Sequence, residues 1–185
     1  MDRSFLGEGT GTGTGSPSSE DIFDGVLMTS PPVKRNYADE QQLNLKILIV
    51  EDSDLQRKLF ANILRKACPY WHVICARDGE DALSKLKAAR LTFDVVIVDE
   101  NLSDSSLKLY GHELVRVMRT KLHMRDCVVI MCTGNDVEGQ VFKGVDKIWT
   151  KPPPKPDVVF REIAAMLKAK MVESSFAESN ESSIE

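Results

Sequence analysis

The sequence predicts an α/β domain built on a parallel β-sheet, with five strands and five helices in alternation. Five short apolar runs alternate along the chain with five segments that carry apolar residues at helical spacing. Several of these runs are rich in Val and Ile, as is typical of strands that are buried on both faces. Strands that alternate with helices form parallel sheets with helices packed on both sides. This fold class alone does not identify a function.

Each predicted element rests on its own local pattern. Each strand is a short run centred on apolar residues: 46–50, 72–76, 94–98, 127–132 and 146–150. Each helix is a longer segment with apolar residues three or four positions apart: 55–67, 79–90, 111–122, 135–143 and 156–170. Ser53 or Asp54 can cap the first helix, and Pro156 suits the first turn of the last.

Apolar positions on the helices predict which sides face the sheet. In the first helix two rows have helical spacing, one with Leu55, Leu59 and Ile63 and one with Phe60 and Leu64. The core-facing residues predicted for the later helices are Leu83, Leu86, Leu114, Val117, Met118, Phe160, Ile163 and Leu167. We also expect Trp71 and Trp149 to be packing residues.

The composition divides the chain into a leader at 1–44, a domain at 45–171 and a tail at 172–185. The leader contains GEGTGTGTGSPSS, which is typical of flexible coil, and its glycines lack the strand and helix that a dinucleotide site requires. The tail, VESSFAESNESSIE, is acidic and rich in serine, so we predict that it is disordered. We expect no output domain within these 14 residues.

Charge and cysteine usage exclude several classes of protein. The formal net charge of −4 does not favour nucleic-acid binding, and the longest apolar runs are far too short to span a bilayer. No secretory signal pattern opens the chain. The four cysteines show no CxxC pairing. Cys127 and Cys132 lie in the predicted strand 127–132, where we expect buried thiols. We therefore expect a reducing compartment, namely the cytoplasm or the nucleus.

Polar side chains stand at the carboxyl ends of four predicted strands. Glu51 and Asp52 follow the first strand, Asp99 the third, Thr133 the fourth and Lys151 the fifth. Ligands of open parallel sheets bind beyond these strand ends. Three carboxylates at ~4 Å would repel by ~4 kcal/mol per pair at an effective dielectric of about 20. Such a group either holds protons or binds a cation.

The chemistry of this group favours a magnesium ion and a phosphoryl group. Oxygen ligands without His or Cys indicate a hard ion, and Mg²⁺ is the usual choice beside phosphate. Lys151 adds a positive charge and Thr133 a neutral donor. An Asp held beside these groups can attack an activated phosphoryl group and form an aspartyl phosphate.

Four motifs at these strand ends carry a resemblance to a known family. LIVEDSD, DVVIVDENL, VVIMCTGND and WTKPPP resemble the marks of the receiver domain of two-component response regulators, over residues 45–171. The resemblance implies a flavodoxin-like, CheY-like fold of three α/β/α layers, with strand order 2-1-3-4-5. It also implies a signalling domain that is not an enzyme, and whose output is protein–protein contact or onward phosphotransfer.

The resemblance assigns roles residue by residue. Asp99 would be the phosphoacceptor, and Asp52, Asp99 and the Asn101 backbone carbonyl would ligate Mg²⁺ directly. Glu51 would act on the metal largely through water. Thr133 and Lys151 would bind the phosphoryl oxygens. The implied phosphoryl donor is a histidine kinase or a histidine phosphotransfer protein. The signal would pass to an output protein of unknown identity. We expect neither nucleic acid nor a membrane as a partner.

The sequence departs from the family pattern in three places. After Asp99, the segment ENLSDSSLKLYG lacks the usual Met-Pro and Asp-Gly and reaches its glycine about four residues late. The interval from Thr133 to Lys151 is about one helical turn shorter than usual, so we expect a stunted fourth helix. Ile148 stands where many members carry a switching aromatic residue.

Two other functions remain as alternatives. A receiver-like module that binds a partner without phosphorylation would fit the altered segment after Asp99. An aspartyl-phosphate phosphatase would fit DENLS, which loosely resembles the start of the haloacid dehalogenase-like motif, but its second Asp is replaced by Asn101. His112 in GHELVR resembles a kinase phosphohistidine box, but no ATP-binding segment follows, so we expect an exposed helix histidine.

Overall fold

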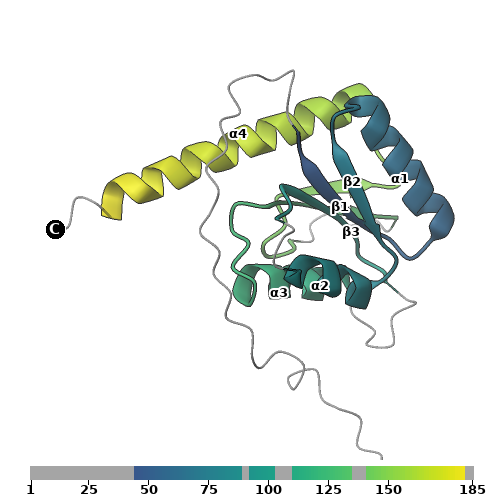
Figure 1. Ribbon diagram of the computed structural model, residues 1–185, viewed down its shortest axis with the longest axis horizontal. Coiled ribbons are helices and arrows are strands. Elements are labelled where there is room, and N and C mark those ends of the chain that lie inside the picture. The colour runs from purple at the N-terminus through teal and green to yellow at the C-terminus, as the bar shows by residue number, and fades with distance from the viewer. Residues whose placement is uncertain (1–43, 89–91, 103–109, 135–140, 182–185) are drawn as a thin grey trace, which may run out of the picture.

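A computed structural model of the chain describes residues 44–88, 92–102, 110–134 and 141–181. Within them are the strands β1 (Lys46–Val50), β2 (His72–Ala76), β3 (Val95–Asp99), β4 (Val128–Thr133) and β5 (Lys147–Thr150). The helices are α1 (Asp54–Ala67), α2 (Gly79–Lys87), α3 (Gly111–Thr120) and α4 (Pro156–Glu181). The strands form one parallel sheet in the order β2-β1-β3-β4-β5, which confirms the predicted flavodoxin-like topology (Figure 1).

The register of the sheet brings the carboxyl ends of the strands to one edge. Val50, at the end of β1, pairs with Ala76 of β2 and Val98 of β3. At the ends of the next strands, Asp99 pairs with Cys132. The residues that follow β1 therefore lie beside the end of β3.

Alternating side chains of the strands fill a core on each face of the sheet. On one face, Ile47 and Ile49 pack with α1 and α4. On the other face, Leu48 and Val50 pack with α2 and α3. Figure 1 shows these two pairs of helices on opposite sides of the strands. The predicted packing roles of Trp71 and Trp149 are confirmed, since both are buried.

The first two helices begin where a side chain caps the exposed N–H groups. Ser53 caps α1, and its hydroxyl accepts a hydrogen bond from the Gln56 backbone N–H at 3.4 Å. Of the two predicted capping residues, Ser53 and Asp54, the structure thus has Ser53. Asp78 caps α2 by accepting from the Asp81 N–H at 2.7 Å. The Ser53 cap thus lets α1 begin at Asp54, three residues after Glu51.

The buried side of α1 carries one of its two predicted rows in full and, from the other row, only Ile63, which is partly buried. Phe60 and Leu64 are buried, but Leu55 and Leu59 are 79% and 46% exposed. The two rows differ by one position, which rotates a side chain by about 100° around the helix axis. Spacing alone cannot tell which row faces the sheet.

The helix α4 continues through Glu181, into the segment 172–185 for which the composition predicted disorder. The segment lacks Gly and Pro and contains Glu and Ala, which favour a helix, whereas its acidic, serine-rich composition had suggested disorder. Ser174 Oγ donates to Asp126 Oδ1 at 2.9 Å. Figure 1 shows this end of α4 projecting beyond the sheet.

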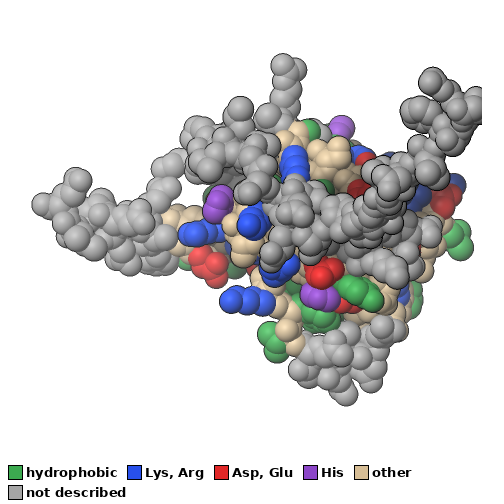
Figure 2. Space-filling model, turned by 90° about the horizontal axis from the view of Figure 1, so that it is seen from below, with side chains coloured by type: hydrophobic (Ala, Val, Ile, Leu, Met, Phe, Trp, Pro, Cys, Tyr) green, Lys and Arg blue, Asp and Glu red, His purple; other side chains and the backbone are tan. Residues whose placement is uncertain are grey.

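Other predicted segments fall partly or wholly outside the described residues. The leader lies outside them except for residue 44, and so do positions 135–140 of the predicted fourth helix, while 141–143 are not helical. None of the helices in the described ranges has an apolar stretch that could cross a bilayer. Seen from the side of α2 and α3, the described side chains of both charges are interspersed (Figure 2).

Candidate functional site: an acidic group at the strand ends

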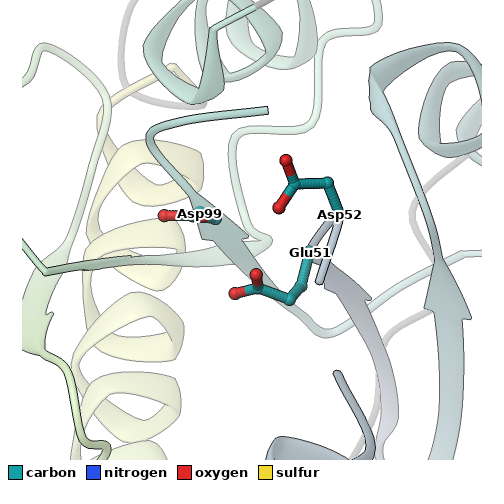
Figure 3. A group of neighbouring side chains, drawn as sticks. All are labelled: Glu51, Asp52 and Asp99. Atoms are coloured by element: carbon teal, nitrogen blue, oxygen red, sulfur yellow. The ribbon is translucent and has the colours of Figure 1, made fainter. Parts of the chain in front are cut away.

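Three carboxylates meet at the edge of the sheet, as the sequence predicted. Glu51 and Asp52 directly follow β1, and Asp99 is the last residue of β3 (Figure 3). One oxygen from each carboxylate lies within 4.8 Å of the others. Glu51 is 2% and Asp99 6% exposed, whereas Asp52 is partly exposed. The strand β3 therefore ends on a buried carboxylate, Asp99, which lies beside the carboxylates of Glu51 and Asp52.

Lys151 joins the two buried carboxylates. Its Nζ lies 2.8 Å from Glu51 Oε2 and 2.8 Å from Asp99 Oδ2. The backbone holds Lys151 there because its N–H donates to the Thr133 carbonyl at 2.9 Å, directly after β5. The ammonium thus offsets part of the negative charge, and the group of three acids and one Lys keeps a net negative charge when all are ionised.

The pKa values of Glu51 and Lys151 reflect this arrangement. Burial raises the pKa of Glu51, and the nearby Asp99 charge adds to this effect, while Lys151 opposes it. Burial alone would lower the pKa of Lys151, but its hydrogen bonds with Asp99 and Glu51 outweigh burial and raise it. Lys151 is therefore a firmly held cation at neutral pH.

The acidic group has the donors that a hard cation requires. Asp99 Oδ1 is buried and accepts no hydrogen bond from the described residues. An unsatisfied buried oxygen is costly, and a cation would satisfy it. Carboxylate oxygens on a partly open edge suit an ion such as Mg²⁺, which keeps several waters. The three acids thus form a candidate metal site.

The backbone that carries the acid pair is held by Arg57 of α1, a contact that our sequence analysis missed. Arg57 Nη1 donates to the Glu51 carbonyl at 2.6 Å and to the Asp52 carbonyl at 3.2 Å, and Nη2 pairs with Asp54 Oδ1 at 2.9 Å. The sequence feature that could have indicated this contact is a basic residue near the start of a helix, when that helix directly follows two acidic residues. Alone, such a residue is usually a surface charge.

The start of α3 packs directly on the backbone of Asp99. A Cβ added to Gly111 would lie 2.3 Å from the Asp99 carbonyl oxygen, so only glycine fits there. The Gly111 N–H donates to the Glu100 carbonyl at 2.9 Å. His112 is half-exposed, as predicted, but it also pairs with Glu100 through Nδ1 at 2.6 Å, which the sequence did not indicate.

Of the other predicted residues, Thr133 and Asn101 lie near the same edge, and Ile148 lies inside β5, two residues before its end. Thr133 is the last residue of β4 and is fully buried. Asn101 is exposed, two residues after Asp99. Ile148 lies in β5 and is partly buried. Their predicted roles toward phosphate, metal and switching stay predictions.

Comparison with known proteins identifies the fold and the family. The family model for the response regulator receiver domain matches residues 47–158, which is more than half of the chain. Among solved structures, the chemotaxis response regulator CheY4 of Vibrio cholerae superposes with a TM-score of 0.55 at 27% identity, over 66% of this chain and 98% of that one.

Curated relatives agree with this match. Chemotaxis protein CheY1 of Helicobacter pylori is 30% identical over 112 residues, which cover 58% of this chain and 86% of that protein. A two-component response regulator-like protein of rice, PRR73, is 31% identical over 103 residues, and a hybrid signal transduction histidine kinase of Dictyostelium discoideum is 28% identical over 138 residues. The matches span only 13% and 6% of those two longer proteins.

Receiver domains are generally signalling domains that interact with histidine kinases or phosphotransfer proteins. The five-stranded parallel sheet, the acidic group at its edge and the match over residues 47–158 agree with one another. The chain therefore belongs to the response regulator receiver family of two-component and phosphorelay systems.

Proposed function

We propose that Asp99 accepts a phosphoryl group from a phosphohistidine donor with the help of Mg²⁺. The observation that carries this proposal is the environment of the Asp99 carboxylate. One of its oxygens pairs with Lys151, and the other is buried with no hydrogen-bond donor among the described residues, beside Glu51 and Asp52. That oxygen is the candidate ligand for Mg²⁺, and the oxygen that Lys151 holds is then the candidate nucleophile.

The transfer forms one bond and breaks another. An Asp99 oxygen attacks phosphorus, the O–P bond forms, and the N–P bond of the donor phosphohistidine breaks, so that the imidazole leaves and takes up a proton. Asp52, Asp99 and the Asn101 carbonyl would hold Mg²⁺, with Glu51 acting largely through water. Bound Mg²⁺ would neutralise charge on the acids and on the phosphoryl oxygens.

Two further residues act on the phosphoryl group in this proposal. Lys151, which pairs with Asp99 at 2.8 Å, would move to the new dianion. The Thr133 hydroxyl would donate to a phosphoryl oxygen from the end of β4. Ile148 replaces the usual aromatic residue in β5, so the change would spread through the β4–β5 edge without an aromatic rotation.

The donor would be a histidine kinase or a histidine phosphotransfer protein, and the output would be contact with another protein or onward transfer. In this proposal the chain is a phosphoacceptor and does not turn over a substrate as an enzyme. The four cysteines are free, which suits a reducing compartment such as the cytoplasm or the nucleus.

The test is phosphoryl incorporation from acetyl phosphate or phosphoramidate, followed on a phosphate-affinity gel. We expect a Mg²⁺-dependent shifted band in the wild type and in the control Asp157→Asn, an exposed acid of α4, and no band in Asp99→Asn. No band with either donor would contradict the proposal and favour a module that binds its partner without phosphorylation. Continuous release of phosphate from a phosphomonoester, lost in Asp99→Asn, would indicate a phosphatase.

A further inference from the structure

The residue after Asp99 is bound to the start of α3 by three contacts. The Glu100 carbonyl accepts from the Gly111 N–H at 2.9 Å. The Glu100 side chain accepts from the His112 backbone N–H through Oε2 at 3.0 Å and pairs with His112 Nδ1 through Oε1 at 2.6 Å. We refer to these contacts among Glu100, Gly111 and His112 as the clasp.

The clasp is tight although the sequence between its two ends is long. Gly111 comes 12 positions after Asp99, later than in the family pattern, yet no atom larger than hydrogen fits between its Cα and the Asp99 carbonyl. The side chain of Leu102 is 2% exposed and fixes the chain on the other side of Asn101. The backbone of residues 99–102 is therefore held at both ends, whatever the path of the residues that follow.

The side chain of His112 is placed by more than one neighbour. Its ring stacks on Tyr110, with ring centroids 5.8 Å apart, and lies 6.3 Å from the Phe142 ring. The Glu100 side chain is only 15% exposed, so its pairing with His112 is better shielded from water than a typical surface pair. Both partners are thus held in one geometry.

We propose that Glu100 and His112 are positioning residues for the phosphoacceptor site. By holding the backbone of residues 99–101 against α3, they fix the Asp99 carboxylate and the Asn101 carbonyl in the arrangement that Mg²⁺ requires. This inference rests on the proposed function. Residues behind the ligands commonly change metal affinity about 10-fold to 100-fold when they are removed.

Glu113 supplies a matched control in the same turn of α3. Its Oε2 accepts from the Tyr110 N–H at 3.0 Å, so it also caps the helix, and this hydrogen bond does not involve Glu100. Glu113→Ala therefore weakens the start of α3 and spares the clasp. Two conservative variants keep the clasp: Glu100→Gln retains an acceptor for the His112 N–H, and His112→Asn places an amide N–H near the position of Nδ1.

The experiment measures two quantities in the full chain. Titration calorimetry gives the Mg²⁺ dissociation constant, and hydrogen exchange without metal reports on the amides of residues 99–102 and 110–114. We expect Glu100→Ala and His112→Ala to weaken Mg²⁺ binding about tenfold and to speed exchange in both segments. Glu100→Gln and His112→Asn should match the wild type, and Glu113→Ala should speed exchange near Tyr110 only.

The outcomes separate this inference from the proposed function. If the wild type binds Mg²⁺ but Glu100→Ala and His112→Ala bind it equally well, or Glu113→Ala weakens it as much, the clasp is only a helix cap and the inference is wrong. If the wild type binds no Mg²⁺, the metal in the proposed function is wrong. The exchange result then decides alone: faster exchange at 99–102 in Glu100→Ala but not in Glu113→Ala supports positioning, and equal exchange overturns it.

Discussion

Lys151 stands between two carboxylates that would otherwise face each other in a buried place. Glu51 and Asp99 are nearly inaccessible to water, and both lie 2.8 Å from the Lys151 Nζ. Removing one partner from a buried group of charges leaves the others uncompensated, which is more costly than losing an exposed ion pair. The apo protein thus depends on the residue that the proposed reaction also uses.

Lys151→Ala should lower the free energy of unfolding by about 3 kcal/mol without Mg²⁺, because Glu51 and Asp99 would then repel each other. Adding Asp99→Asn should recover part of the loss, since one of the two charges is removed. Urea unfolding of both variants and of Asp99→Asn alone gives the coupling. Equal losses in the single and double variants would show that the repulsion is not the cause.

The buried thiols should be unreactive in the folded chain. Burial raises the pKa of Cys127 to about 12 and that of Cys132 to about 12, so almost no thiolate exists at pH 8. Iodoacetamide at about pH 8 should modify neither residue until urea unfolds the protein. Peptide mapping by mass spectrometry checks this, and rapid native labelling of Cys132 would contradict it.

Sequence reasoning found the acids and Lys151 because parallel strands bring residues after their ends to one edge. It missed Arg57 and the pairing of Glu100 with His112. Each of these contacts joins a helix to a strand end through one long side chain, and such contacts leave no periodic pattern. The roles predicted for Thr133 and Asn101 await the phosphorylation test.

At the scale of the elements, Arg119 ties α3 to the chain on either side of β4. Its Nε donates to the Gly144 carbonyl at 3.0 Å, and Nη1 donates to the Cys127 carbonyl at 2.8 Å and to the Met124 carbonyl. Its Nη2 pairs with Asp146 at 2.8 Å. The single guanidinium thus fixes the entrances of β4 and β5 against α3.

Arg119→Ala should lower the free energy of unfolding by about 3 kcal/mol, because several carbonyls lose a charged donor at once. Arg116→Ala, at an exposed position one turn earlier on α3, is the control and should change it by less than about 0.5 kcal/mol. Chemical unfolding followed by circular dichroism measures both. Similar values for the two variants would contradict the assigned role of Arg119.

The start of α2 should make stability depend on acid pH. Burial alone would raise the pKa of Asp81, but hydrogen bonds from Lys85 and the Arg77 N–H outweigh it and lower the pKa below 3.8. A lowered folded pKa stabilises the protein above the unfolded value, and this contribution is lost as the pH falls through the folded value. Thermal unfolding between about pH 5 and pH 3 should show a smaller loss in Asp81→Asn than in the wild type. An identical pH profile for the two proteins would contradict this assignment.

At the scale of the whole molecule, the parallel sheet with helices on both faces followed from the alternation of strands and helices, and the strand order followed from the resemblance to receiver domains. The boundaries of β1 and β2 match the prediction, and those of β3, β4 and β5 differ by one residue. The sequence did not predict how far α4 extends. The prediction rested on the serines and acids of residues 172–181 and did not take into account that this segment lacks Gly and Pro. The segments with regular apolar spacing thus predicted the fold, and the segment without it did not.

The projecting end of α4 should be dispensable for stability. Among the described side chains of α4, those up to residue 175, Leu167 is the last buried one, and Ser174 contributes one exposed hydrogen bond to Asp126. A chain that stops after Met171 should lose less than about 1 kcal/mol of unfolding free energy. A chain that stops after Glu162, which loses the buried Ile163 and Leu167, should fail to fold, and circular dichroism and urea unfolding distinguish the two. A large loss on removing residues 172–185 alone would contradict this.

The contact between Glu100 and Gly111 has a practical consequence for engineering. The chain leaves the sheet after Asp99 and enters α3 at Gly111, and the hydrogen bond from Gly111 to Glu100 keeps these two ends together, so a guest domain whose termini lie close together suits an insertion between Leu102 and Tyr110. The guest would stand beside Asp99 while the strand and helix that flank it keep their contacts. Under the proposed function, a fluorescent protein grafted there would give a genetically encoded sensor of phosphorylation at Asp99.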